Sequence, residues 1–181
     1  MQWPLRHYNG LMQSLLVGLV FTAVLAPTLK FDAPDGWVAK TPSSTMRVAE
    51  FALPRAATDA EDASLTVYFF GATQGGSVSA NIDRWIGQMT QPDGKASKDV
   101  AKTSAMESHG LKISLVDLTG TYVAEMSPGA TEHFNKPGFR LRAAVVETPG
   151  GPYYVKVIGP SATVAKWDPS VAQFLKSLRY E

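Results

Sequence analysis

The sequence predicts an α+β domain in which an antiparallel-rich β-sheet is covered by two amphipathic helices. A hydrophobic helix is expected to precede this domain at the N-terminus. Three observations support the prediction. Short runs rich in β-branched and aromatic residues recur along the chain, with Pro and Gly between them. Two other segments carry apolar residues at helical spacing. A run without a full charge lies between Arg6 and Lys30, ahead of all of them.

Residues 1–26 have the three-part form of a secretory signal peptide. Arg6 supplies a positive charge, and an apolar core over residues 11–26 follows it. The small residues of Val24-Leu25-Ala26 then predict cleavage after Ala26. A core of about 16 residues is shorter than most membrane-spanning helices, which favours a cleaved signal.

An uncleaved membrane anchor is the alternative, because the apolar stretch can be extended over residues 8–29. Pro27, directly after the expected cleavage site, can also hinder the peptidase. Contact with the membrane is then expected only through residues 8–29. Both alternatives place the single α+β domain, residues 29–181, outside the cytoplasm. The protein is therefore expected to be periplasmic, secreted or membrane-anchored.

The strands are predicted from alternating and β-branched runs that end at Pro, Gly or acidic turns. The clearest hairpin joins residues 140–147 and 153–158 across Thr148-Pro149-Gly150-Gly151-Pro152. Residues 124–139 are the least regular stretch, either an ordered lid or a surface loop. Residues 29–37 are expected to form a short strand and then a Pro/Gly turn that brings Trp37 to the core. Longer strands are expected at residues 46–53, 64–70, 96–106 and 111–123.

Two helices are expected to pack on the sheet and to cover one of its faces. The first spans about residues 77–90. The second region covers residues 161–177, where Asp168-Pro169 indicates a fresh helix start. The side chains expected in the core are Trp37, Phe51, Val67, Phe69, Ile82, Trp85, Ile86, Val155, Phe174 and Leu178.

Several strand edges and turns resemble an uncharacterised family of exported bacterial domains. They are Phe31-x-Ala33-Pro34-x-Gly36-Trp37, Tyr68-Phe69-Phe70-Gly71 with Gly75-Gly76, Asn81-Ile82-x-Arg84-Trp85, Gly150-Gly151-Pro152-Tyr153-Tyr154-Val155-Lys156 with Gly159-Pro160, and Phe174-Leu175-Lys176-Ser177-Leu178. The resemblance covers about residues 29–179 and extends distantly to the PsbP-like α/β/α sandwiches. It implies a fold and carries no metal ligand or activity with it.

Composition excludes several chemistries. The chain contains no cysteine, which excludes disulfides, thiolate metal sites and a Cys nucleophile. Removing residues 1–26 takes away Arg6 and no acid, so acidic and basic side chains balance in the remaining domain. Such a surface lacks the electrostatic attraction that nucleic-acid binding needs. His109 and His133 have no metal-ligand spacing, so neither a metal nor a cofactor is expected.

The best candidate for a recognition patch lies on the hairpin. Tyr153-Tyr154 alternates on its strand, so one ring is expected to point outward beside Arg140 and Arg142 of the partner strand. His133, in the neighbouring irregular loop, completes the predicted binding residues Arg140, Arg142, His133 and Tyr154. A plain exposed sheet face is the structural alternative. The glycine-rich turn at Gly71-x-x-x-Gly75-Gly76 lacks the Lys of a phosphate-binding loop.

These observations predict a non-catalytic binding or accessory domain of the cell envelope, acting on an envelope protein or a small ligand. The alternative is a hydrolase with dispersed catalytic residues near His133, since a Ser-His-Asp triad need not be close in sequence. A Ser and an Asp within hydrogen-bond reach of His133 would favour that enzyme.

Overall fold

The computed structural model describes residues 27–181. The predicted signal peptide or anchor at residues 1–26, its hydrophobic helix and the cleavage after Ala26 lie outside the described residues. Within residues 27–181, no helix is long and apolar enough to cross a membrane.

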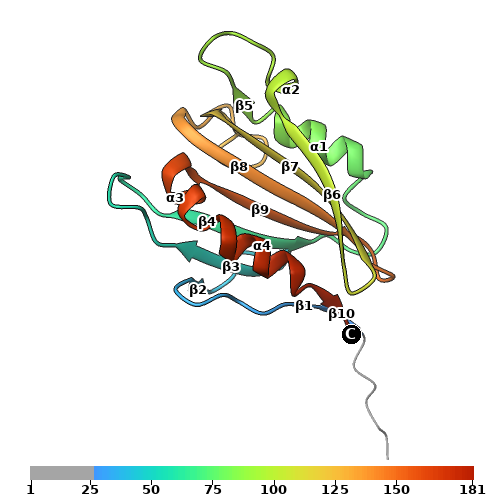
Figure 1. Ribbon diagram of the computed structural model, residues 1–181. Coiled ribbons are helices and arrows are strands. Elements are labelled where there is room, and N and C mark those ends of the chain that lie inside the picture. The colour runs from blue at the N-terminus through green and yellow to red at the C-terminus, as the bar shows by residue number, and fades with distance from the viewer. Residues whose placement is uncertain (1–26) are drawn as a thin grey trace, which may run out of the picture.

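An antiparallel eight-stranded sheet forms the centre of the molecule (Figure 1). Its strand order is β2-β3-β4-β9-β8-β7-β5, and β6 also pairs with β7. The strands are β2 (Val38–Lys40), β3 (Arg47–Leu53), β4 (Ala63–Phe69), β5 (Met89–Thr90), β6 (Lys102–Ser108), β7 (Leu111–Tyr122), β8 (Lys136–Glu147) and β9 (Tyr153–Pro160). The predicted hairpin is confirmed as β8 and β9, with Val146 opposite Tyr153.

Four helices accompany the sheet in the described part of the chain: α1 (Val78–Ile86), α2 (Ser97–Val100), α3 (Ser161–Lys166) and α4 (Asp168–Lys176). The Ser77 hydroxyl caps α1 by accepting a hydrogen bond from the Ala80 N–H at 3.2 Å. Pro169 lies in the first turn of α4, where its missing N–H leaves no helical bond unmade. The predicted fresh start at Asp168-Pro169 is therefore confirmed.

The helices cover opposite faces of the sheet, which corrects the expectation that both cover one face. In Figure 1, α3 and α4 (red) lie over one face and α1 (green) lies beyond the other. Phe174 and Leu175 of α4 pack in one apolar cluster with Val155, whereas Trp85 of α1 packs in another with Tyr154. Successive strand residues point to opposite faces of the sheet. Because both faces are covered, the neighbours Tyr154 and Val155 are both buried.

The expected core is largely confirmed. Phe51, Val67, Trp85, Ile86, Val155, Phe174 and Leu178 are buried. Trp37, Phe69 and Ile82 are partly buried and pack at the edges of the two clusters.

The strand predicted at residues 96–106 is wrong over its first half. Residues 97–100 form the short helix α2, and the strand β6 begins at Lys102. The Ser97 hydroxyl donates to the Met89 carbonyl at 2.7 Å and accepts from the Gln91 amide at 3.1 Å. These bonds hold the segment against β5 and provide an alternative to a strand ladder.

The two ends of the described chain lie side by side. A two-stranded sheet pairs β1 (Leu29–Lys30) with β10 (Arg179–Tyr180). The Thr28 N–H donates to the Glu181 carbonyl at 2.8 Å, and the Glu181 N–H donates back to the Thr28 carbonyl at 3.1 Å. Both termini of the domain therefore leave the same region of the molecule.

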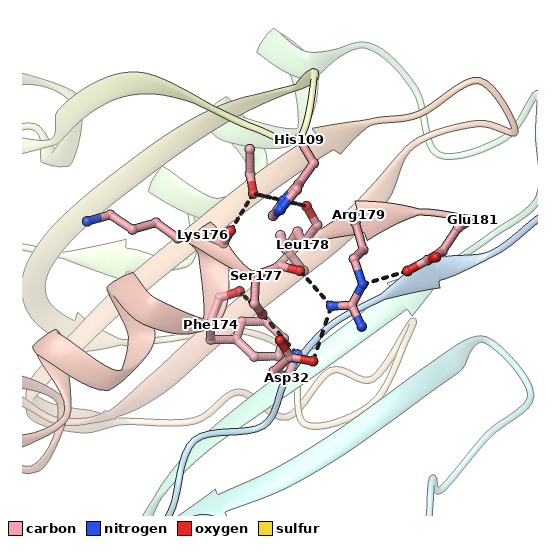
Figure 2. A network of polar contacts seen from close by, with 9 residues as sticks. Asp32, His109, Phe174, Lys176, Ser177, Leu178, Arg179 and Glu181 are labelled. Carbon is pink, nitrogen blue, oxygen red and sulfur yellow. Dashed lines mark hydrogen bonds and ion pairs between the residues drawn. The ribbon is translucent and has the colours of Figure 1, made fainter.

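Side chains reinforce this closure, as Figure 2 shows. Arg179 donates to the Asp32 carboxylate at 3.1 Å and to the Glu181 carboxylate at 2.6 Å. The His109 Nδ1 lies 3.1 Å from the Leu178 carbonyl, which brings the β6–β7 turn to the end of α4. His109 adopts a φ of 46°, so this turn holds a non-glycine residue in the left-handed region.

Candidate functional site

A cluster of two arginines and two aspartates lies where α4 begins over the sheet. Arg140 binds Asp117 through two hydrogen bonds of 2.8 and 2.6 Å and reaches Asp168 at 2.9 Å. Arg142 binds Asp168 at 2.5 Å and lies 3.5 Å from Asp117. Both arginine side chains are 19% exposed. The four charges balance, so each guanidinium has two carboxylate partners.

Local geometry explains how these residues meet. Arg140 and Arg142 are two apart on β8 and therefore share a face, and Arg142 is directly opposite Asp117 of β7. Asp168 is the first residue of α4, where the helix dipole favours a negative charge. The hydrogen bonds that Arg140 donates to the carboxylates of Asp117 and Asp168 outweigh burial and raise its pKa above the ordinary value.

An open hollow of about 360 Å³ lies beside this cluster. We call it the ion-pair hollow; it is lined by Val100, Lys102, Asp117, Leu118, Thr119, Arg140, Ser161 and Ala165. A narrower cavity of about 70 Å³ shares Asp117 with it and continues between the sheet and α4, among Arg142, Val155, Val157, Val171, Leu175 and other residues. Paired polar groups next to an apolar wall are the usual composition of a ligand site.

The structure brings together only part of the predicted patch. Arg140 and Arg142 lie side by side, as expected, but they are partly buried in ion pairs and do not reach freely into solvent. Tyr154 lies on the other face of the sheet and is 1% exposed, so the expectation of an outward ring beside the arginines was wrong. The cause is that both faces are covered: α1 packs on the face of Tyr154, and Tyr153 is buried in the cluster on the α4 face, so neither ring points outward.

The Tyr154 hydroxyl is buried without a hydrogen-bond partner among the described residues. A Cβ at Gly75 would lie only 2.1 Å from it, so the glycine there permits a close approach of the backbone to the ring. Burial raises the pKa of this phenol. Tyr154 is therefore a packing residue of the α1 face.

His133 lies exposed in the loop between β7 and β8. Its Nδ1 is 3.1 Å from the Thr131 carbonyl, and no side chain within residues 27–181 forms a hydrogen bond with the ring. Within the described chain, neither a Ser nor an Asp side chain is therefore hydrogen-bonded to His133, which is what the hydrolase alternative called for. In the same part of the chain, no cluster of three or more His, Asp or Glu side chains is arranged to hold a metal ion.

Sequence reasoning missed the acidic half of the cluster. Asp117 is the only acid in β7, and Asp168 is the only acid in α3 and α4. Two arginines on one strand face require counter-charges when a helix covers that face, and these lone acids were the signal that could have identified them.

Comparison with known proteins supports the fold. The chain matches no family model and none of the curated proteins. Among solved structures it is similar to LpqN of Mycobacterium tuberculosis, described as involved in cell envelope biogenesis. The TM-score is 0.55 at 10% identity, with 86% of this chain and 84% of LpqN covered.

A second similar structure is PA94 from Pseudomonas aeruginosa, with a TM-score of 0.46 at 16% identity over 85% of this chain and 96% of that one. Likeness at these identities concerns the fold alone. The mixed α+β architecture is thus one that LpqN shares, and the closer resemblance to PsbP-like sandwiches stays a prediction.

Proposed function

We propose that this chain is an exported accessory domain of the cell envelope that acts by binding, with the ion-pair hollow as its binding surface. The observation that carries the proposal is the hollow itself, where the paired charges of Arg140 and Asp117 border apolar side chains. The N-terminal segment that resembles a secretory signal supports export, and so does the envelope role that LpqN's description states. We also propose that the fold is related to the PsbP-like sandwiches.

The lining of the hollow indicates what kind of group it accepts. Lys102 and Arg140 offer donors, Asp117 offers acceptors, and the hydroxyls of Thr119 and Ser161 can do both. Val100, Leu118 and Ala165 supply the apolar part. A partner with neighbouring donors and acceptors, such as a polar segment of an envelope protein or a small hydroxylated ligand, matches this lining better than a bare ion.

Cross-linking from a single cysteine tests the proposal, because the natural chain has none. Ala165→Cys places a thiol at the rim of the hollow, and Ala162→Cys places one on the same helix outside it. Both residues are exposed. With a thiol-linked photoreactive group in native envelope, the position-165 variant should give a discrete adduct that the position-162 variant does not. Equal adduct patterns, or none from either position, would contradict binding through the hollow.

A further inference from the structure

Lys156 occupies an unusual position for a lysine. It lies in the middle of β9 on the α1 face of the sheet and is only partly exposed. Its ammonium donates to the Gln88 side-chain carbonyl at 2.6 Å and to the Tyr122 hydroxyl at 3.0 Å. The Nζ also lies 4.9 Å from the centroid of the Tyr122 ring. We call Lys156, Gln88 and Tyr122 the Lys156 site.

Both hydrogen-bond partners of this ammonium are neutral. Within residues 27–181, no carboxylate lies within ion-pair distance of the Lys156 Nζ. An ammonium has three donors, and two are used here, so one N–H is left for an incoming acceptor. Buried or partly buried cations in proteins are normally paired with an anion, and this one is not.

Two further cations near Lys156 make the surroundings of the site more positive. Arg84 of α1 and Arg47 of β3 are the cations that act on Lys156. Arg47 is held by Glu50 at 2.8 Å, and Glu50 also accepts two hydrogen bonds from Ser43. Arg84 donates to the Asn81 amide at 2.5 Å, which carries no charge. One carboxylate therefore offsets three cations on this part of the face.

Aromatic rings line both sides of the site. Tyr68 stacks on Phe70 at a centroid distance of 5.9 Å, and Tyr122 stacks on Phe134 at 5.4 Å. Tyr68, Phe70 and Tyr122 all pack against the apolar cluster of the α1 face, on which Lys156 lies. Low-polarity walls strengthen any charge–charge interaction between them.

We propose that the Lys156 site binds an oxyanion, a carboxylate or a phosphate-like group, which completes the coordination of the ammonium. An anion would complement the charges here, because the partly buried ammonium has a free N–H, two guanidinium groups lie nearby, and no carboxylate of the described chain pairs with Lys156. This surface lies on the face opposite the ion-pair hollow, so the inference does not depend on the proposed function.

The titration behaviour of the site agrees with this assignment. Burial, followed by the charges of Arg84 and Arg47, lowers the pKa of Lys156 to about 8. Burial, together with Tyr68, raises the pKa of Tyr122 to about 12, so the phenol stays protonated. Oxyanion binding stabilises the ammonium and should raise the Lys156 pKa. Affinity should fall as the pH rises through 8, because the cation is lost.

NMR of the lysine ε-methylene groups in the folded domain tests the inference, with sulfate and acetate as separate probes at pH 7. Sulfate keeps the same charge from pH 5 to 10, so a pH effect reports on the protein. The Lys156 resonance should shift to saturation at millimolar concentration of at least one anion. Its pKa should rise in the presence of that anion, and affinity should drop about tenfold between pH 7 and 9.5. Preference for sulfate indicates a phosphate-like ligand, and preference for acetate a carboxylate.

Gln88→Glu is the decisive variant, because it places a carboxylate beside the ammonium with little change in shape. It should weaken anion binding at least tenfold while the domain stays folded. Lys156→Met should do the same, and because this variant lacks the lysine reporter, its binding is followed through the ring resonances of Tyr122. Lys40→Met, on the exposed strand β2, should bind as the wild type does. The inference is overturned if neither anion shifts the Lys156 resonance, or if the Gln88→Glu and Lys156→Met variants bind as the wild type does.

Discussion

At the scale of single residues, one buried hydroxyl connects the β6–β7 turn to the C-terminal end of α4. Ser108 is 6% exposed, and its Oγ lies 2.7 Å from the Lys176 carbonyl and 3.0 Å from the Leu178 carbonyl. Those carbonyls follow the last helical turn, where no further N–H of the helix is available to them. The hydroxyl has one proton to donate, and the shorter distance favours the Lys176 carbonyl, while the Leu178 carbonyl also has the His109 Nδ1 at 3.1 Å.

Ser108→Ala should lower the free energy of unfolding by about 1–2 kcal/mol, because it leaves these partly buried carbonyls short of a donor. Urea unfolding measures the difference. Ser64→Ala removes an exposed hydroxyl whose bond to the Ile158 carbonyl is long, at 3.5 Å, and should change stability by less than about 0.5 kcal/mol. Equal losses in the two variants would show that the Ser108 hydroxyl has no special role.

Lys156 gives a prediction about pH. Its pKa is about 8 in the folded domain and about 10.4 in an unfolded chain. Between these values the unfolded state binds more protons, so stability should rise with pH over this interval. At pH 7 the charged lysine costs stability on the order of 1–3 kcal/mol.

Lys156→Met should therefore stabilise the domain at pH 7 relative to the wild type, and this advantage should shrink at pH 9.5. Urea unfolding of both proteins at the two pH values measures the difference. Tyr122, the other group of the site with a shifted pKa, is present in both proteins and so does not distinguish them. A variant that is less stable than the wild type at pH 7 and equally so at pH 9.5 would show that Lys156 contributes by packing and hydrogen bonds, without a charge penalty.

Lys156 shows how much of a residue's environment could be predicted from the sequence. The alternation of β9 placed Lys156 on the same side as Tyr154, and the sequence contains nothing more about its surroundings. Gln88 follows α1 and Tyr122 ends β7, and only the packing of α1 on β7 and β8 brings them to the lysine. Partners that lie 34 and 68 residues away are not visible in a local pattern.

At the scale of elements, the ion pairs determine where α4 begins against the sheet. Asp168 is the first residue of α4 and joins Arg140 and Arg142 of β8, while Val171, Phe174 and Leu175 supply the apolar contact. The apolar stripe fixes which face of the helix is buried. The paired charges fix the point along β8 at which α4 begins.

A double-mutant cycle on Arg142 and Asp168 tests this role. The cluster is partly exposed, so solvent weakens the pairing, and the coupling energy should be about 1–2 kcal/mol. It should decrease in 1 M salt, because screening acts on partly exposed charges. A coupling below about 0.3 kcal/mol, obtained from urea unfolding of the four proteins, would mean that α4 is positioned by its apolar face alone.

Helices and strands were predicted well where a periodic pattern was long. They were predicted less well where side-chain hydrogen bonds determine the backbone conformation. The hairpin of β8 and β9 and the stripe of α1 were recognised because their repeats match the geometry of strand and helix. Residues 97–100 were misjudged because the bonds of Ser97 to Met89 and Gln91, eight and six residues away, hold a helical turn that no strand or helix repeat indicates. The cover on both faces was missed although β9 carries apolar side chains on both sides, with Lys156 as the one charge, and a sheet covered on one face does not need this pattern.

At the scale of the whole molecule, the described domain offers two distinct surfaces on opposite faces of one sheet. The ion-pair hollow lies on the side of α3 and α4, and the Lys156 site lies on the side of α1. The two ends of the described chain meet where β1 pairs with β10. Both surfaces are available to partners in the same compartment.

The most direct test of the central claim, that this is a binding domain outside the cytoplasm, is the reaction of single cysteines with a membrane-impermeant maleimide. Lys102→Cys lines the hollow, and its neighbour Thr103→Cys is equally exposed on the same strand but points to the opposite face. Labelling rates are compared in intact cells, after the reagent has been admitted past any outer membrane, and in purified protein.

Both positions should be labelled in intact cells. Position 102 should react at least severalfold more slowly there than in purified protein, while position 103 should react at the same rate in both. Labelling that appears only after the cytoplasmic membrane is broken would contradict export. Equal rates at position 102 in cells and in purified protein would contradict an occupied hollow.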